Sequence, residues 1–299
     1  MYDIIGDIHG HADELKALLN KLGYTESKGI YQCPGRKVIF VGDYIDRGPK
    51  ILETLQIVRN MVEEGHAIAL MGNHEYNALC FQYPDKSGGH LRKHSIKNIV
   101  QHYATLEAFK HEHKLYEDYL EWFLTLPLFF EEEQFRVVHA CWDQQHISYL
   151  QQTLDNNRLT RELIYEASQK GSDLYHAVED TLKGKEINLP SCQKVPDKEG
   201  FLRKELRIKW WENPANHTYQ TLAFPHNPNL PNDPIDITQL KSNHYYPAHE
   251  KKVFFGHYWL TGEPEPCREN IYCLDYSVAK EGKLVAGKLD EEGVSFVFD

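Results

Sequence analysis

The sequence predicts an α/β fold in which central β-sheets are flanked by helices. Short apolar runs alternate with helical patterns through the first third of the chain, the order expected of strands joined by crossover helices. Four more apolar runs close the chain, at 252–257, 270–276, 283–290 and 293–299. The length of 299 residues, 41% of them hydrophobic, suits one large or two small globular domains.

The first elements are defined by apolar runs and helix boundaries. Residues 2–6, 37–42 and 66–72 are short apolar runs typical of buried strands. Between them, 11–24 has leucines at helical spacing, and 49–65 begins with Pro49 and ends with Gly65, as helices commonly do. This order predicts a largely parallel sheet with right-handed crossovers.

The middle of the chain is predicted to be mainly helical, over 75–127 and 144–183, with 116–127 as the clearest helix. Between these stretches, "LFFEE" and "FRVVHA" (135–140) are typical of a β-hairpin. Residues 184–250 contain eight prolines and indicate long loops that cover another surface. We therefore expect one domain, 1–299, with a helical and loop insertion at approximately 144–250.

Composition excludes several classes of protein. The formal net charge of −11 disfavours a nucleic-acid partner, because proteins that bind phosphate backbones are more often basic. No stretch approaches the roughly 20 apolar residues of a membrane span, and the N-terminal "MYDIIGDIHG" does not resemble a signal peptide. The six cysteines are scattered without a CxxC pair, which indicates reduced thiols. We expect a cytoplasmic protein without a membrane partner, and find no indication of its oligomeric state.

Polar residues stand at the ends of five predicted strands. The first three strands end in "GDIHG", "GDYIDRG" and "GNHE", and two later strands end in histidine. The residues offered there are Asp7, His9, Asp43, Asn73, His139 and His257. Because ligands of open α/β sheets bind beyond the carboxyl ends of the strands, we expect these side chains to meet. Carboxylate, imidazole and amide groups together suit Mn²⁺, Fe or Zn²⁺, and one carboxylate can bridge two metals.

Each of these residues also has an ordinary interpretation. An aspartate after a strand is most often a turn former, and Asn73 could cap the helix that follows it. His139 and His257 could be buried histidines with satisfied hydrogen bonds. Coincidental caps would not favour this mixture of residue types at five separate strand ends, so the metal site is the stronger hypothesis.

The three motifs "GDIHG" (6–10), "GDYIDRG" (42–48) and "GNHE" (72–75), in this order, resemble those of the calcineurin-like metallophosphoesterases. The likeness is to a bacterial-type member of the phosphoprotein phosphatase branch. It continues through "LTLPLFFEEEQFRVVHA", "FFGH" and the closing segment 270–290, and it is thin from 144 to 250. The resemblance implies the calcineurin-like fold, with β-sheets between helices and a helical and loop cap.

The resemblance implies two divalent transition-metal ions, with Mn²⁺ favoured and Fe or Zn²⁺ as alternatives. Asp43 would bridge both metals. The other implied ligands are Asp7 and His9 for the first metal, and Asn73, His139 and His257 for the second.

The resemblance also implies the catalytic groups. His74 would be the general acid, oriented by Asp46, and Arg47 would bind phosphate oxygens. The implied reaction is the hydrolysis of a phosphomonoester by a metal-activated hydroxide, as in Ser/Thr protein phosphatases. The partner would be a phosphorylated substrate, either a phosphoprotein or a small phosphoester or nucleotide.

A second phosphate-binding arginine is harder to place. In the family it follows an element similar to "WENP" (211–214), yet no arginine occurs between Arg207 and Arg268. Arg203 or Arg207 could substitute from the other side, and we assign substrate binding to Arg207. The alternative is a surface charge on a helix formed by "RKELRIKWW".

Aromatic residues follow two of the predicted metal ligands, where the family pattern differs. The chain has "HACWD" after His139 and "GHYWL" after His257. Trp142, Tyr258 and Trp259 could form a remodelled pocket wall, although ordinary core packing is the favoured interpretation.

Two enzymatic functions remain open at this point. A Ser/Thr protein phosphatase-like activity is favoured by Asp46, because symmetrical tetraphosphatases usually lack this aspartate. Hydrolysis of diadenosine tetraphosphate is the alternative, since the aromatic residues could stack on a nucleobase. A nuclease is disfavoured by the acidic charge, and a non-catalytic scaffold by the presence of every expected ligand and of His74.

Overall fold

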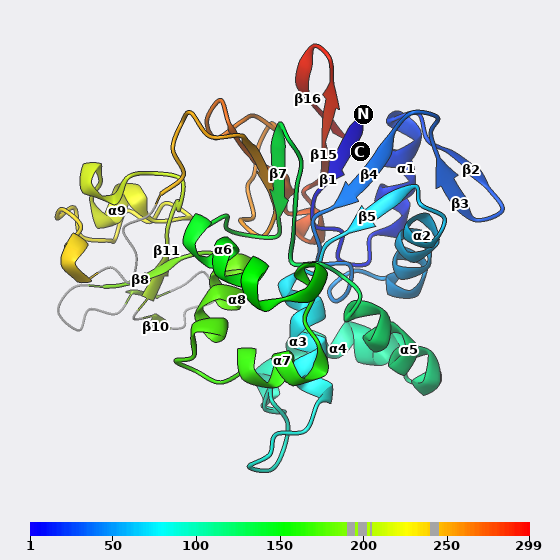
Figure 1. The fold of residues 1–299 in the computed structure, drawn as a ribbon, viewed down its shortest axis with the longest axis horizontal. Helices are drawn as coiled ribbons and strands as arrows, with labels where there is room; N and C mark the ends of the chain where they lie inside the picture. The colour runs from blue at the N-terminus through cyan, green and yellow to red at the C-terminus, as the bar shows by residue number, and fades with distance from the viewer. Residues whose placement is uncertain (190–194, 197–201, 204, 240–244) are drawn as a thin grey trace.

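Two β-sheets form the centre of the molecule (Figure 1). The computed structural model of the chain describes residues 1–189, 195–196, 202–203, 205–239 and 245–299. The larger sheet has the order β14-β15-β1-β4-β5, with β16 beside β15, and the second has the order β13-β12-β7-β6. Strands of the larger sheet are β1 (Tyr2–Ile5), β4 (Lys37–Phe40), β5 (Ala67–Ala69), β14 (Asp275–Tyr276), β15 (Lys283–Asp290) and β16 (Gly293–Phe298). Strands of the second sheet are β6 (Phe129–Glu131), β7 (Phe135–Val138), β12 (Lys252–Phe255) and β13 (Ile271–Cys273).

Both sheets have a parallel centre. β1, β4 and β5 run parallel to one another, as do β7, β12 and β13. The predicted α/β class is therefore confirmed, and "LFFEE" with "FRVVHA" forms the expected hairpin β6–β7. The prediction of one largely parallel sheet is too simple, because β15 pairs antiparallel with β1 and β16. A short turn joins β15 to β16, and a hairpin of that kind can only be antiparallel.

Helices cover the outer faces and the carboxyl ends of the strands. The first two are α1 (Ala12–Lys21) and α2 (Ile51–Glu63), close to the predicted bounds. The remaining helices are α3 (Asn73–Gln82), α4 (Ile96–Ala108), α5 (His113–Phe123), α6 (Gln144–Thr153), α7 (Arg161–Ala167), α8 (Asp173–Lys183) and α9 (Tyr219–Leu222). In Figure 1, β4 and β5 point towards α3 and α4. An exposed hairpin, β2 (Thr25–Ser27) with β3 (Ile30–Gln32), lacks the apolar pattern that would have predicted it.

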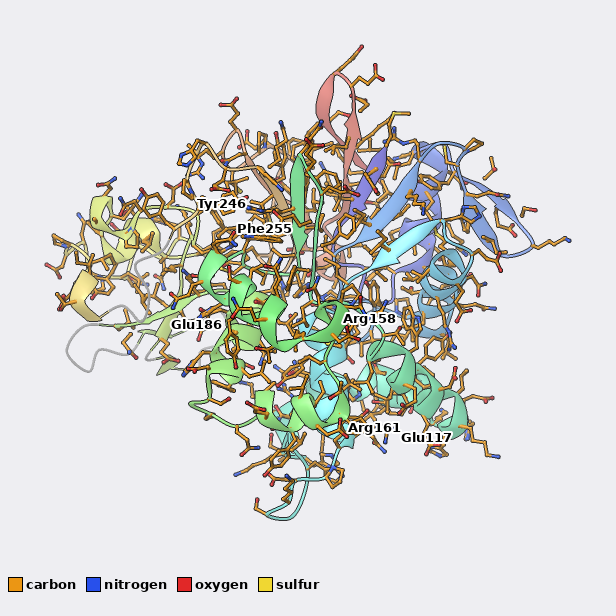
Figure 2. All side chains as sticks on the ribbon, in the orientation of Figure 1. Glu117, Arg158, Arg161, Glu186, Tyr246 and Phe255 are labelled. Atoms are coloured by element: carbon orange, nitrogen blue, oxygen red, sulfur yellow. The ribbon has the colours of Figure 1, made fainter. Side chains whose placement is uncertain are left out.

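The alternation of side chains along the strands places apolar groups on both faces of the larger sheet. Ile39 of β4 packs in a cluster with Val137 and Phe254 of the second sheet. Its neighbour Phe40 belongs to the larger cluster formed with the helices. The core is thus a sandwich of two sheets with helices outside, which fixes the carboxyl ends of the parallel strands relative to one another. Phe255 lies within this core, whereas Glu117 on α5 and Arg161 on α7 extend at the periphery (Figure 2).

The described parts of 184–250 form short elements beside the sheets (Figure 1). β8 (Glu186–Asn188) pairs antiparallel with β11 (Glu205–Arg207), and β9 (Val195–Pro196) pairs with β10 (Leu202–Arg203). A separate apolar cluster joins Ile187 and Ile208 to residues of α9. The division into one domain with an insertion at 144–250 stays a prediction.

The described cysteines are free thiols: Cys33, Cys80, Cys141, Cys267 and Cys273. Cys192 lies outside the described residues.

In the part of the chain that the structure describes, none of the helices combines the length and apolar character that a bilayer crossing requires.

Candidate metal centre

The side chains predicted at the strand ends lie together in the structure. Asp7 and His9 follow β1, Asp43 follows β4, Asn73 begins α3 after β5, and His139 and His257 follow β7 and β12. All six are buried, with exposed fractions between 0% and 8%. His9, Asp43 and His257 have φ values of 48°, 55° and 67°, in the left-handed region that such residues rarely adopt. Strained backbone of this kind concentrates at functional sites.

Asp43 stands between two groups of possible ligands. Its Oδ2 is 3.6 Å from His9 Nε2, and its Oδ1 is 3.5 Å from His139 Nε2. Among the described residues, two sets have ligand atoms within 4.8 Å of one another: His9, Asp43 and His74, and Asp43, His139 and His257. Asp43 is the member that both sets share. The arrangement therefore fits a carboxylate that bridges two cations, one on each oxygen.

Hydrogen bonds orient two of the histidines towards Asp43. His9 Nδ1 lies 2.9 Å from the Ile45 carbonyl oxygen, and His139 Nδ1 lies 2.9 Å from that of Val41. A carbonyl only accepts, so Nδ1 carries the proton and Nε2 keeps the lone pair that a metal needs. Burial lowers the pKa of His9 to about 3 and lowers the pKa of His139, which favours the neutral ligand form.

Several buried atoms of the site lack a partner in the protein. Asp7 Oδ1, His9 Nε2 and His257 Nε2 have no hydrogen-bond partner within the described part of the chain. Buried polar atoms are otherwise nearly always satisfied. Burial, Asp275 and Asp43 also raise the pKa of Asp7 well above its usual value, because its negative charge is uncompensated. Bound cations would satisfy these atoms and charges, so the residues present fit a metal centre.

Two glycines allow the ligands to approach closely. A Cβ on Gly256 would lie 1.8 Å from Asp7 Oδ1, and a Cβ on Gly72 would lie 2.2 Å from Asp43 Oδ1. Any side chain at either position would displace a carboxylate. The glycine before a ligand in these motifs is thus required by space at the site.

His74 and Asp46 form a buried pair at the edge of the centre. His74 Nδ1 is 2.5 Å from Asp46 Oδ2, and His74 Nε2 is 3.9 Å from Asp43 Oδ2. Burial opposes charge on both groups. For Asp46, hydrogen bonds from His102 and His74 outweigh burial and hold its pKa well below the usual value. For His74, Asp43 and Asp46 outweigh burial and raise its pKa. The imidazole is therefore held as a proton carrier with Nε2 towards the metal ligands.

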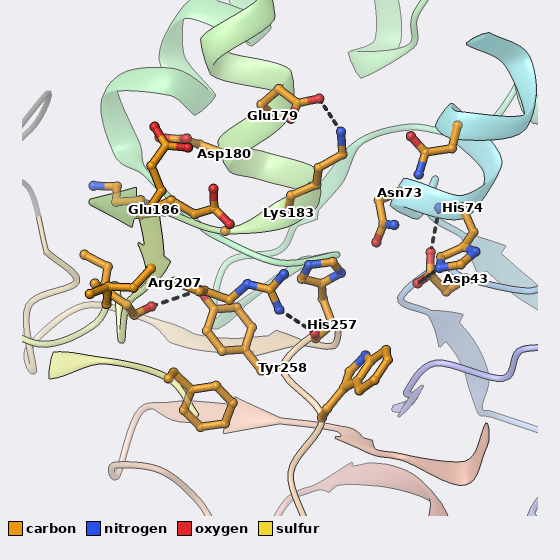
Figure 3. Close-up of a pocket in the computed structure, with 18 of the residues that line it drawn as sticks. Asp43, Asn73, His74, Glu179, Asp180, Lys183, Glu186, Arg207, His257 and Tyr258 are labelled. Carbon is orange, nitrogen blue, oxygen red and sulfur yellow. Dashed lines mark hydrogen bonds and ion pairs between the residues drawn. The ribbon is translucent and has the colours of Figure 1, made fainter. Parts of the chain in front are cut away.

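Arg47 and Arg207 reach the same pocket from different elements. The Arg47 guanidinium lies over the ring of Trp259, 4.3 Å from its centroid. Arg207 Nη1 donates to the carbonyl oxygen of His257 at 3.2 Å, and its buried Nε has no partner among the described residues. Figure 3 shows Arg207 and His257 on one side of the pocket, with Asn73 and His74 on the other. Both arginines line the pocket, so both are available to a phosphate bound there.

The structure resolves two of the open sequence questions. Arg207 lies on strand β11 and not on a helix, whereas the side chain of Arg203 lies outside the described part of the structure. Trp142 and Tyr258 are buried, with 2% and 1% of their surface exposed, as the core interpretation expects. Trp259 differs, because it is only partly buried and lines the pocket between the cations of Arg47 and Lys280.

Three residues around the centre were not predicted. Glu75 accepts hydrogen bonds from the backbone N–H groups of Gly72, Asp43 and Tyr44, and so fixes the loop after β4. Its position three residues after Gly72, within "GNHE", is a capping-box signal that could have identified it. His102 and Thr105 of α4 contact Asp46 and have no recognisable sequence signal.

The pocket that contains these residues has a volume of about 1970 Å³. Its wall includes Asp43, Asn73 and His257 of the candidate metal centre and residues of α4, α8, β8 and β11. The cationic side chains that line it are Arg47, Arg92, Lys97, Lys170, Lys183, Lys185, Arg207 and Lys280. Small-molecule sites usually measure 300–1,000 Å³, so this pocket could hold a substrate much larger than a phosphomonoester.

Parts of this sequence are similar to known proteins. A family model described as calcineurin-like phosphoesterase matches residues 2–258. A protein of Halalkalibacterium halodurans named bis(5'-nucleosyl)-tetraphosphatase PrpE (asymmetrical) is 38% identical over 145 residues, 46% of this chain and 56% of its own. A Bacillus subtilis protein of the same name is 47% identical over 74 residues, 24% of this chain and 30% of its own. The chain thus spans about half, or less, of the length of these curated relatives.

Solved structures support the fold. The cold-active protein-tyrosine phosphatase of a psychrophilic Shewanella species superimposes with a TM-score of 0.54. The comparison covers 99% of this chain and 79% of that one, at 16% sequence identity. At this identity the similarity concerns the fold alone.

Proposed function

Because this chain belongs to the calcineurin-like phosphoesterase family, we propose that it is a dinuclear metal-dependent hydrolase of phosphate esters and anhydrides. The substrate with the best support is a bis(5'-nucleosyl) tetraphosphate. The observation that carries the dinuclear site is Asp43, whose two oxygens face two separate groups of ligands. Asymmetrical cleavage of a four-phosphate chain would give a nucleoside monophosphate and a nucleoside triphosphate.

The proposed metal ligands are those that the family resemblance implies, and the distances around Asp43 support them. Asp7 and His9 would hold one cation, and Asp43 would contact both. The second cation would be held by Asn73, His139 and His257. Mn²⁺ is favoured and Fe or Zn²⁺ are alternatives, because the ligands combine carboxylate, imidazole and amide groups. When bound, two divalent cations make a water molecule acidic enough to attack phosphorus and neutralise the charge of the phosphoryl group.

The residues of the chain perform the remaining steps. Arg47 and Arg207 bind the oxygens of the reacting phosphate from two sides and align it for attack. As the new P–O bond forms, the bond to the leaving group breaks and its electron pair stays on the leaving oxygen. His74 Nε2 donates its proton to that oxygen, while the bond from Nδ1 to Asp46 holds the ring in place.

Three observations support the dinucleotide substrate. The curated relatives are named asymmetrical tetraphosphatases. The pocket volume of about 1970 Å³ exceeds what a phosphomonoester needs. Its wall has seven acidic and eight cationic side chains, and Lys183 and Lys185 are ion-paired with Glu179 and Asp143. Among the other cations, Arg47 and Arg207 could contact a polyphosphate. Tyr103, Tyr149 and Phe224 also line it, and aromatic rings of this kind can stack on nucleobases.

A Ser/Thr protein phosphatase-like activity on phosphomonoesters is the second candidate. Its support is Asp46, which is hydrogen-bonded to His74 as the phosphoprotein phosphatase resemblance implies. The presence of Asp46 disfavours only a symmetrical tetraphosphatase, because symmetrical enzymes usually lack this aspartate. The matched relatives are named asymmetrical. Asp46 therefore does not separate the two candidates. For either activity, the scattered cysteines keep the cytoplasm as the expected compartment.

A substrate panel with Mn²⁺ tests the proposal. It comprises diadenosine tetraphosphate, p-nitrophenyl phosphate, phosphoserine and phosphotyrosine peptides, and a cyclic dinucleotide, with products separated by ion-exchange chromatography. We expect the highest kcat/KM for the tetraphosphate, with AMP and ATP as products. Rapid turnover of phosphopeptides with little cleavage of the tetraphosphate would instead support the second candidate. Two ADP molecules as products would exclude asymmetrical cleavage.

A further inference from the structure

Helix α4 buries polar side chains and exposes apolar ones. All of α4 is described, and its fully buried side chains are His102 and Thr105, with 5% and 0% of their surface exposed. In contrast, Ile96, Val100 and Tyr103 are 84%, 68% and 59% exposed. Burying polar groups costs free energy unless hydrogen bonds compensate for it. This helix reverses the usual pattern of buried apolar and exposed polar residues. The two polar residues therefore have a role in the site beneath the helix.

Both buried residues bind the carboxylate of Asp46. His102 Nδ1 is 2.8 Å from Asp46 Oδ1, and the Thr105 hydroxyl donates to the same oxygen at 2.5 Å. The Thr105 oxygen also accepts from the backbone N–H of Asp46 at 3.0 Å. His102 and Thr105 are three positions apart, so they lie on one face of the helix. Together they fix the backbone and one carboxylate oxygen of Asp46.

The other end of the chain of hydrogen bonds is also anchored. His102 Nε2 is 2.8 Å from the hydroxyl of Tyr116 on α5, which is itself buried. An ionised carboxylate only accepts, so His102 Nδ1 must donate to Asp46. The hydroxyl of Tyr116 is then the hydrogen-bond partner of His102 Nε2. Through this bond, α5 fixes the orientation of the His102 ring. With Oδ1 occupied, Asp46 keeps Oδ2 for His74.

We propose that His102 and Thr105 are positioning residues, which orient the proposed proton donor His74 through Asp46. This inference rests on the proposed function, because it concerns the proton that His74 delivers to the leaving oxygen. The network holds Asp46 Oδ2 in line with His74 Nδ1, so that Nε2 points towards the reacting phosphate. The family resemblance in the sequence does not assign a role to any residue of α4.

The test uses two aryl phosphates with different leaving groups. Phenol is a weaker acid than p-nitrophenol, so phenyl phosphate depends more on protonation of the leaving oxygen. We expect Thr105→Val and His102→Leu to lower kcat for phenyl phosphate roughly ten-fold and for p-nitrophenyl phosphate less than about two-fold. Thr105→Ser and His102→Asn keep a donor near Asp46, and they should restore most of the loss. KM should stay within about two-fold, since both side chains are buried and bonded to Asp46.

A double-mutant cycle separates a role through His74 from general damage. In a His74→Asn background, Thr105→Val should cause no further loss, because the group that it positions is already absent. Thr54→Val is the matched control, since Thr54 is a buried threonine whose hydroxyl has no partner among the described residues. It should leave both rates unchanged.

Three results would overturn the inference. Equal losses for both aryl phosphates would indicate a purely structural role for α4, as would additive losses in the cycle. If the valine and leucine variants unfold, the serine and asparagine variants decide, because whatever loss remains in them must be larger for phenyl phosphate than for p-nitrophenyl phosphate. A wild-type chain with Mn²⁺ that hydrolyses neither the aryl phosphates nor diadenosine tetraphosphate would refute the proposed function itself, and the inference with it.

Discussion

Replacing Gly256 by alanine should damage the metal centre although no proposed ligand is substituted. A Cβ at this position would lie 1.8 Å from Asp7 Oδ1, whereas real Cβ contacts are essentially never below 3.0 Å. The carboxylate must therefore move by at least 1.2 Å. The φ angle of Gly256 lies outside the left-handed region, so the substitution adds no backbone strain. Its effect on the metal centre should therefore come from the displaced carboxylate.

The size of this effect follows from the displacement. Moving a catalytic group by about 1 Å can cost roughly 10²-fold in rate. Disturbing the surroundings of a metal ligand typically costs about 10–100-fold in affinity, or about 1.4–2.7 kcal/mol. Overpacking a dense interior adds about 1–3 kcal/mol of destabilisation. We therefore expect Gly256→Ala to bind one Mn²⁺ about 10–100-fold more weakly and to lose about 10²-fold in kcat at moderate Mn²⁺.

Calorimetric titration of Mn²⁺ and elemental analysis of the purified variant check this prediction. Gly287→Ala is the control, because the nearest atoms to its Cβ would belong to Phe254, at 3.0 Å, and Leu274, at 3.5 Å, and to none of the proposed ligands. The control should lose some stability but keep both metal affinity and kcat. The reasoning would be refuted by a folded Gly256→Ala variant that binds two Mn²⁺ with wild-type affinity.

The remaining predictions concern the bridge, the second arginine and one buried ion pair. Asp43→Asn should lower kcat by at least about 10²-fold and bind fewer than two metals per chain, with the circular dichroism spectrum unchanged; wild-type turnover would contradict the bridging role. Arg207→Leu should raise KM about 10–150-fold, because a charged hydrogen bond contributes about 1.5–3 kcal/mol; wild-type values of both KM and kcat would exclude a contact between Arg207 and the phosphate. The pair between Asp143 Oδ2 and Lys185, at 2.5 Å, should stabilise the fold in a pH-dependent way. Burial raises the pKa of Asp143, but Lys185 and backbone N–H groups outweigh burial and lower it. Its stabilisation is therefore complete above the unfolded pKa of about 3.9 and is lost as the pH falls through the folded value. Asp143→Asn should cost about 1.5–3 kcal/mol of unfolding free energy at pH 7 and less at pH 3; an equal cost at both would exclude the linkage.

Most of the metal centre could be predicted because its residues are close to strand ends. Each ligand follows an apolar run within a few residues, and glycines precede Asp7, Asp43, Asn73 and His257 directly. Local sequence therefore contains both the strand and the group that it delivers. The same reasoning placed β1, β4 and β5 within a few residues of their observed bounds.

Contacts between residues that are far apart in the sequence could not be predicted from local sequence patterns. His102 reaches Asp46 across 56 positions, from a helix whose apolar residues face outwards. No periodic pattern marks such a residue as buried. The alternative that Arg207 lies on a helix is wrong, because pairing with β8 places the residue on β11. Non-local pairing of this kind overrides the local preference that the sequence displays.

The central claim is that two divalent cations share Asp43. A crystal structure of the chain grown with Mn²⁺, measured at the manganese absorption edge, tests it most directly. We expect two anomalous peaks about 3.5–4 Å apart. One should lie beside Asp7 and His9, the other beside His139 and His257, with Asp43 between them. A single peak, or two peaks without Asp43 between them, would contradict the account.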